Sequence, residues 1–407
     1  MLPMYMKRLI DGRSSLATST MISQLSMLLF LFVLKLKMAD AVFGNFLVSL
    51  GIASIVGAVA SLRSEVLITQ VDRCVNARTL FWPVFIAVAV VIFAWAISPL
   101  ISWLFSIDIP VYTTVLAFGL SLQSICQFVL IQETQFFRLL LLRAAQAAIL
   151  IATSLALLAD LTFAWSIWGF AIAIIGPFAI WSVFWLASKR GLAVSNFAFE
   201  PSQLRRSAIL SLTLLVNTAA VNIPIILCVA TQNASYAADF GFLMKIFGAP
   251  STLANAMFGQ LFMADNIRRD ISIPGEAQSV RRAMHKTSVR AIGFVSMISM
   301  GTILGVFLLV YFLPSFLTHP ILASTIAIAI IAQAGFSPVS AFGDIAKLEN
   351  PFLLFYLVRV IVLYGLLSTA MDIDFSVRFA AINLVVYLGF WLYADRRLGK
   401  VSNAPRH

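Results

Sequence analysis

The stretch TLFWPVFIAVAVVIFAWAISPL, from Thr79 to Leu100, decides the fold of this chain. It contains no charged residue, and it is long enough to cross a bilayer, because a helix rises about 1.5 Å per residue and the hydrocarbon is about 30 Å thick. Backbone amides without partners are costly in hydrocarbon, so a segment of this kind crosses as an α-helix. The stretch therefore predicts a transmembrane helix.

Similar apolar runs recur along all 407 residues, of which 61% are hydrophobic and only 11% are charged. A soluble fold of this length could not bury so much apolar surface. We expect an all-α integral membrane protein with about twelve crossings, arranged as two six-helix lobes around a central cavity. The expected crossings are approximately residues 16–34, 41–62, 79–100, 111–132, 139–158, 164–187, 207–230, 240–263, 291–313, 321–343, 351–371 and 375–394.

The basic residues set the expected topology, because short cytoplasmic loops collect Lys and Arg. With the N-terminus inside, nearly all of them fall on the cytoplasmic side, and Lys35, Lys37 and Arg378 fall outside. Both termini are therefore predicted to be cytoplasmic. The net charge of +11 is explained by this bias and by attraction to anionic lipid headgroups, so it does not indicate a nucleic-acid partner.

The polar segment between the sixth and seventh runs divides the chain into expected parts. These are an N-terminal lobe at 1–187, a cytoplasmic linker at 188–206, a C-terminal lobe at 207–396 and a tail at 397–407. The other long polar segment, from Asp265 to Arg290, is expected to be a cytoplasmic loop.

Weak internal similarity suggests that the two lobes arose by duplication. Phe43-Gly44 followed by Gly51 recurs as Phe240-Gly241 followed by Gly248, which aligns the start of the first lobe with that of the second. Phe136 with Arg143 likewise matches Phe352 with Arg359. Duplicated halves are common among transporters.

Charged residues within the spans are the first candidates for function, because a charge in hydrocarbon costs several kcal/mol unless it faces a partner or a cavity. Arg143, Lys245 and Arg359 fall within the expected spans, and no Asp or Glu does. A cavity lined by these residues would suit an anionic substrate such as a phosphate or diphosphate. Alternatively, the three side chains snorkel to the interface, or Lys245 pairs with Asp239.

Amide side chains add candidate lining residues. Gln123 and Gln127 lie one helical turn apart and share a face, and Asn217 and Asn222 occupy the seventh span. Hydrogen bonding between helices is the alternative role for such amides.

Candidate gating residues lie at the ends of the spans. Arg63 and Glu65 close the second span on the cytoplasmic side, where they form either an inner gate or an interfacial anchor. Lys35 and Asp40 could act in the same way at the outer side, as could Asp239. No catalytic motif, metal-ligand cluster or cofactor motif is present.

Three stretches, Phe43–Ile68, Asn222–Phe262 and Gly335–Leu363, resemble the polysaccharide transporter family, with a supporting match at Phe136–Ala147. This family comprises the O-antigen or lipid-linked oligosaccharide flippases of the multidrug/oligosaccharidyl-lipid/polysaccharide exporter superfamily. The resemblance implies a multi-pass protein of the bacterial inner membrane, not an enzyme. It implies that this protein flips an undecaprenyl-diphosphate-linked oligosaccharide by alternating access, for O-antigen, capsule or exopolysaccharide synthesis. Expected partners are that substrate, membrane lipids, a polysaccharide polymerase and a chain-length regulator.

Two other functions remain open. A drug or cation antiporter of the same superfamily usually needs a carboxylate in the membrane. A membrane-embedded sugar polymerase or glycosyltransferase would need catalytic groups on a sizeable outer loop, and the outer loops here are short.

Overall fold

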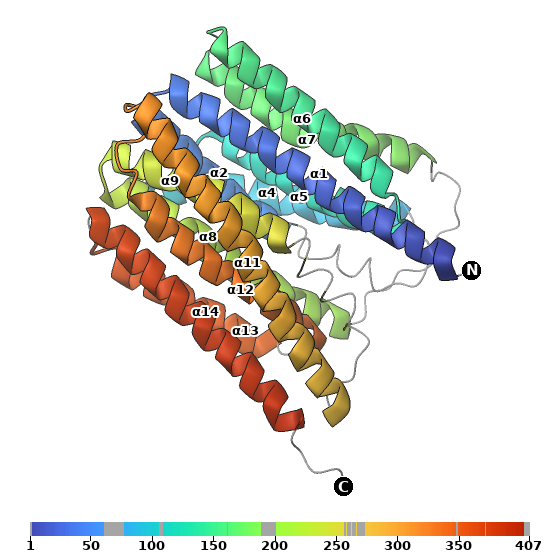
Figure 1. Ribbon diagram of the computed structural model, residues 1–407. Helices are drawn as coiled ribbons and strands as arrows, with labels where there is room; N and C mark the ends of the chain where they lie inside the picture. The colour runs from blue at the N-terminus through green and yellow to red at the C-terminus, as the bar shows by residue number, and fades with distance from the viewer. Residues whose placement is uncertain are drawn as a thin grey trace. The chain divides into compact units, whose positions relative to one another are not determined.

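The computed structural model contains α-helices joined by short connections, and no strands, over the residues that it describes (Figure 1). These are residues 2–60, 77–105, 109–160, 162–188, 201–255, 258, 262, 266, 273–346, 349–370 and 372–402. They form twelve helices, which confirms the predicted all-α membrane fold.

The first of two compact units covers Met1–Ala230. Within it α1 packs on α6, α2 on α5, and α7 on both α5 and α6. Its core includes a stack of Phe30 on Phe170 at 4.9 Å, with the ring edge of Phe46 against both. Its helices are α1 (Leu2–Lys37), α2 (Asp40–Ala60), α4 (Ala77–Phe105), α5 (Val111–Gln132), α6 (Phe136–Leu158), α7 (Phe163–Ser188) and α8 (Pro201–Thr231).

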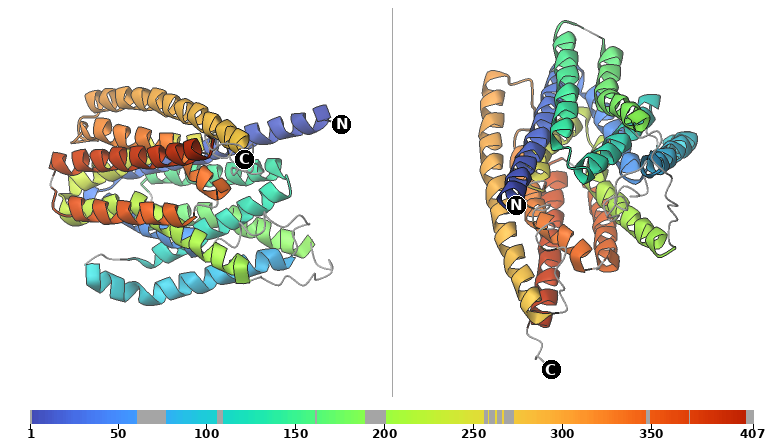
Figure 2. Two further views of the ribbon diagram at one scale, coloured as in Figure 1. Left: turned by 90° about the horizontal axis from the view of Figure 1, so that it is seen from below. Right: turned by 90° about the vertical axis from the view of Figure 1, so that its right-hand side faces the viewer.

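The second unit covers Thr231–His407. Here α12 packs between α11 and α14, and the N-terminal half of α11 runs beside the C-terminal end of α14 (Figure 2). Aromatic side chains fill the centre, with Phe336 against both Tyr387 and Phe390. The helices are α9 (Ala234–Ala254), α11 (Pro274–Phe312), α12 (Leu322–Ala346), α13 (Glu349–Leu367) and α14 (Asp372–Ser402).

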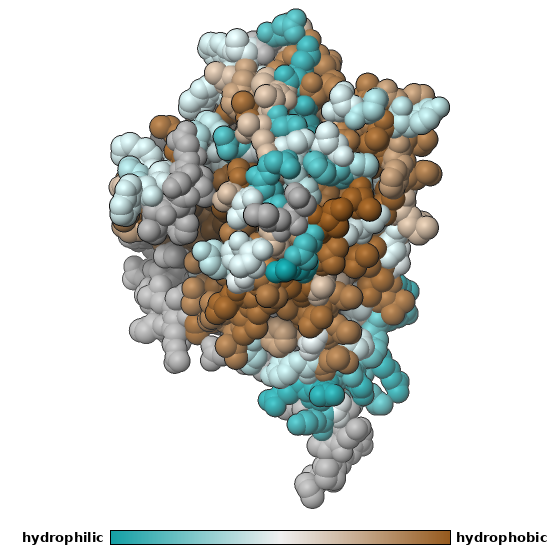
Figure 3. Space-filling model, turned by 90° about the vertical axis from the view of Figure 1, so that its left-hand side faces the viewer, coloured by the Kyte–Doolittle hydropathy of each residue, from teal (hydrophilic) through white to brown (hydrophobic). Residues whose placement is uncertain are grey.

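Nine of the helices in the described part of the chain are long and apolar enough to cross a membrane. Of the other three, α12 and α13 contain shorter apolar segments, and α9 carries Asp239 and Lys245. The face drawn in Figure 3 presents a hydrophobic area, with hydrophilic side chains both below it and above it. The chain is a multi-pass membrane protein.

Two glycines of α2 lie at contacts with other helices of the first unit, and one of these contacts depends on glycine. A Cβ atom on Gly57 of α2 would lie 2.9 Å from the carbonyl oxygen of Ala117 on α5. A Cβ atom on Gly51 would lie 3.4 Å from Asn222 on α8. Glycine thus lets α2 approach the backbone of α5 more closely than any other residue would allow.

The predicted loop from Asp265 to Arg290 is wrong in its second half, because α11 already begins at Pro274. Proline favours the first turn of a helix, since its missing N–H is not needed there. The residues that follow have an amphipathic pattern, in which Ala277, Val280 and Met284 are fully buried.

The predicted lobes and linker remain a prediction. The two compact units divide the chain after Ala230, so α8 belongs to the first unit. Residues 189–200, most of the predicted linker, lie outside the described part of the chain.

Candidate functional site

Arg143, a predicted binding residue on α6, lies at the centre of a polar cluster in the first unit. Its Nη2 donates to Gln127 Oε1 on α5 at 3.0 Å. Its Nη1 donates to Ser23 Oγ on α1 at 3.2 Å and to Gln146 Oε1 on α6 at 3.1 Å. Gln123 also accepts from Arg143 when its amide oxygen faces the guanidinium group. The structure thus brings together three of the predicted residues, Arg143, Gln123 and Gln127.

The charge of Arg143 is not neutralised by any acid among the described residues: all of its hydrogen-bond partners are neutral. Its guanidinium lies 5.5 Å from the ring centroid of Phe178 on α7, which adds a cation–π contact. The cluster is therefore a pre-organised cation that could bind an anion. The sequence interpretation missed Ser23, Gln146 and Phe178, although Gln146 follows Arg143 by one helical turn.

Arg359 occupies a related setting on α13 in the second unit. It is only 2% exposed, and its Nη2 donates to Asn383 Oδ1 on α14 at 2.7 Å. Its guanidinium lies 4.6 Å from the ring centroid of Tyr387 on α14.

Arg143 and Arg359 thus share their chemistry as well as their sequence context. Each donates to an amide oxygen, and each lies over an aromatic ring carried by the next helix, Phe178 for Arg143 and Tyr387 for Arg359. This correspondence agrees with the predicted duplication.

Lys245 on α9 is partly buried and makes no hydrogen bond or ion pair with the described residues. A Cβ atom on Gly248, one turn further on, would meet nothing within 4 Å, so this face of α9 borders open space. An ammonium group is strongly hydrated, and this position is compatible with either an anionic ligand or water.

The two predicted asparagines of α8 do not join the Arg143 cluster through any contact in the described part of the chain. Asn222 is buried, donates to the Thr218 carbonyl of its own helix at 2.9 Å and lies against Gly51. Asn217 is partly exposed. Asn222 is therefore placed for helix packing, the alternative role that the sequence left open.

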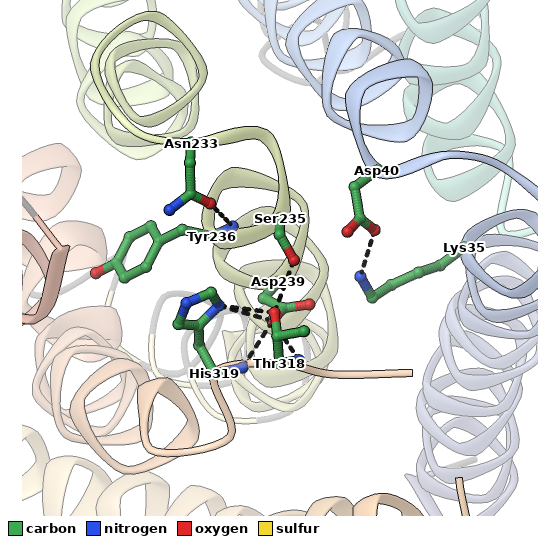
Figure 4. Close-up of polar contacts among 8 residues, drawn as sticks. All are labelled: Lys35, Asp40, Asn233, Ser235, Tyr236, Asp239, Thr318 and His319. Atoms are coloured by element: carbon green, nitrogen blue, oxygen red, sulfur yellow. Dashed lines mark hydrogen bonds and ion pairs between the residues drawn. The ribbon is translucent and has the colours of Figure 1, made fainter. Parts of the chain in front are cut away.

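Two of the predicted gating residues form an ion pair in the first unit, and their gating role remains a prediction. Lys35 Nζ at the end of α1 lies 3.4 Å from Asp40 Oδ1 at the start of α2, and the lysine side chain is only 2% exposed (Figure 4). The other pair, Arg63 and Glu65, lies outside the described residues.

Asp239 in the second unit anchors the loop between α11 and α12 (Figure 4). Its Oδ2 accepts from the backbone N–H groups of Thr318 and His319, each at 2.9 Å, and from Thr318 Oγ1 at 2.9 Å. His319 Nδ1 lies 3.2 Å from the same oxygen, and the histidine ring packs edge-on against Tyr236 at 5.2 Å.

The position of Asp239 corrects one expectation. The sequence placed this residue just outside a span beginning at 240, but α9 already begins at Ala234, where Asn233 accepts from the Tyr236 N–H at 2.8 Å as N-cap. Asp239 is therefore within the helix and 1% exposed. A buried carboxylate is present in the helical bundle.

No group of three or more His, Cys, Asp or Glu side chains able to hold a metal ion occurs among the residues that the structure describes. No protein-family model and no curated protein matches the sequence.

Solved structures with the same fold are MATE transporters. One, described as "MATE in the straight conformation", has a TM-score of 0.56 and 12% identity, covering 98% of this chain and 97% of its own. An outward-facing multidrug resistance MATE family transporter of the MOP superfamily gives a TM-score of 0.55 and 13% identity, covering 97% of each chain. An inward-facing multidrug resistance MATE family transporter gives a TM-score of 0.50 and 15% identity, covering 96% of this chain and 95% of its own.

These likenesses do not test the polysaccharide transporter family that the sequence resembles. At this level of identity they establish the fold. The chain has the fold of the MATE transporters.

Proposed function

We propose that this protein is a membrane transporter that works by alternating access. The observation that carries the proposal is the likeness, over almost the whole chain, to transporters solved in outward-facing and inward-facing conformations. A fold that adopts both conformations in those proteins can also change between an outward-facing and an inward-facing conformation here.

Antiport of drug-like compounds is the candidate function that the comparisons favour. Two of the similar structures are described as multidrug resistance transporters. The lack of an acid in the expected spans argued against this function, but Asp239 is buried within α9. A buried carboxylate can bind a coupling proton or cation, which removes that objection.

Flipping of an undecaprenyl-diphosphate-linked oligosaccharide is the second candidate, and the Arg143 cluster is the observation that favours it. Its guanidinium has only neutral partners among the described residues, so its positive charge remains available to a phosphate. The family resemblance of the sequence points to the same substrate and to function alongside a polysaccharide polymerase and a chain-length regulator.

Reconstitution of the purified protein in liposomes separates the two candidates. One assay follows a fluorescent lipophilic cation under a pH or sodium gradient, and the other follows a fluorescent undecaprenyl-diphosphate sugar between leaflets. Each assay is repeated with Asp239→Asn and Arg143→Gln.

An antiporter should move the cation only under a gradient, lose this activity with Asp239→Asn and keep it with Arg143→Gln. A flippase should move the lipid-linked sugar and lose this activity with Arg143→Gln. If the folded protein moves neither cargo, the proposed transport function is contradicted for both.

A further inference from the structure

The helix α11 is much longer than a membrane crossing. Its 39 residues span about 58 Å, nearly twice the thickness of the hydrocarbon. The second half, Ala291–Phe312, contains no charged residue and is about 33 Å long, which is enough to cross the hydrocarbon. The first half, Pro274–Arg290, therefore extends beyond it.

This extension is held firmly against the end of α14. Arg281 donates from Nε to Asp395 Oδ1 at 2.6 Å and from Nη2 to Oδ2 at 2.7 Å. His285 Nε2 lies 2.6 Å from the same carboxylate, and its ring packs edge-on against Trp391 at 4.7 Å. A bidentate contact of this kind fixes the geometry of both helices.

The outward face of the extension carries a basic stripe, Arg282, Lys286 and Arg290, one residue per helical turn, and all three are exposed. Further along α11 the same face presents Met297, which is 69% exposed, and Leu304, which is 62% exposed. An exposed apolar face on a membrane helix lies against lipid tails.

The end of α14 repeats this arrangement. Leu388 and Leu392 are exposed, and the same face continues to the exposed Arg396 and Lys400. On both helices, a lipid-facing apolar stripe is thus followed by cations at the height of the headgroups.

These cations have no acidic partner among the residues that the structure describes. Asp395, the nearest acid on α14, is already bound to Arg281 and His285. A Lys or Arg side chain at a membrane surface is attracted electrostatically to the phosphates of anionic lipids beside it.

We propose that the exposed basic stripes at the joined ends of α11 and α14 bind the phosphates of anionic phospholipids. The stripe on α11 covers about 12 Å along the helix axis, which spans the headgroup layer, and the Arg281–Asp395 contact holds the second stripe beside it. This site does not depend on the proposed transport function.

A local probe tests the proposal in the full-length protein. A fluorophore is attached at Val289→Cys, an exposed position within the α11 stripe, after Cys74, Cys126 and Cys228 are replaced by alanine. Quenching by spin-labelled phosphatidylglycerol is then compared with quenching by spin-labelled phosphatidylcholine. The control probe is Tyr311→Cys, which is at the other end of α11 and equally open to lipid.

Phosphatidylglycerol should quench the probe at 289 at least about fivefold more effectively than phosphatidylcholine, the factor expected for a single cation at a membrane surface. The control at 311 should not distinguish the two lipids. Most of the preference at 289 should be lost in a triple variant that carries Arg282→Gln, Lys286→Gln and Arg290→Gln. In the protein with all three cations, 0.5 M salt should have the same effect. An equal response to both lipids at 289, or the same preference at 311, would overturn the proposal.

Discussion

The guanidinium group of Arg143 on α6 donates to the amide oxygen of Gln127 on α5 at 3.0 Å. Neither residue has an acidic partner in the described part of the chain, so this contact links two membrane helices without neutralising the charge. The same cation can therefore stabilise helix packing and attract an anionic cargo, and these two roles predict different effects of substitution.

Two substitutions of Arg143 distinguish the role of its charge from the role of its hydrogen bonds. Arg143→Gln leaves the amide oxygens of the part-buried Gln127 and the buried Gln146 without their donor, and should lower stability by about 1–3 kcal/mol. Arg143→Lys keeps the charge but not the forked geometry, so an anionic cargo should still move, more slowly. Thermal unfolding in detergent and transport in liposomes measure the two effects.

Arg138→Gln is the control for the two Arg143 variants, because Arg138 is exposed on the same helix. It should change stability by less than about 0.5 kcal/mol and leave transport intact. Arg143→Gln with full stability and full transport of an anionic cargo would contradict both roles.

Removing Asp239 should release the loop between α11 and α12. In Asp239→Ala, the backbone N–H groups of Thr318 and His319 lose their acceptor, which should cost about 1.5–3 kcal/mol. Hydrogen exchange at residues 313–321 should accelerate. Asp374→Ala, which removes an exposed ion pair with Arg378, should cost less than about 1 kcal/mol. Unchanged exchange in Asp239→Ala would mean that other contacts hold the loop.

The sequence predicts the helices well because crossing a bilayer constrains every residue of a span. Apolar length alone located α4 and α5. The spacing of Gln123 and Gln127 placed both amides on one face of a helix, and the structure shows that this face meets Arg143. Polar helices were harder to predict. The first half of α11 has the polar composition of a loop, and its amphipathic pattern together with its contacts with α14 explains why it is helical.

The partners of the candidate residues could not be predicted, because they depend on which helices pack together. Tyr387 and Asn383 resemble ordinary span residues until α14 is placed against Arg359. Asn222 looked like a lining residue, but it packs against Gly51 of α2.

Gly57→Ala should destabilise the first unit. The added methyl group would lie 2.9 Å from the Ala117 carbonyl oxygen, and the backbone of α5 cannot move aside as a flexible side chain would. A cost of about 1–3 kcal/mol is expected for such overpacking. Gly305→Ala on α11 is the matched control, because nothing lies within 4 Å of its Cβ position. Equal melting temperatures for the two variants would argue against a tight α2–α5 contact.

The contact between Arg359 and Tyr387 predicts that the aromatic ring matters more than its hydroxyl group. The guanidinium lies 4.6 Å from the ring centroid, and a desolvated cation–π contact contributes about 2 kcal/mol. Tyr387→Phe keeps the ring and should preserve stability within about 0.5 kcal/mol. Tyr387→Leu removes the ring, so it should lose the stabilisation by the cation–π contact. In an Arg359→Met background, the difference in stability between the two Tyr387 variants should shrink, because the cation is absent. This double-mutant cycle separates the cation–π contact from simple packing. A difference of the same size in both backgrounds would assign the effect to packing alone.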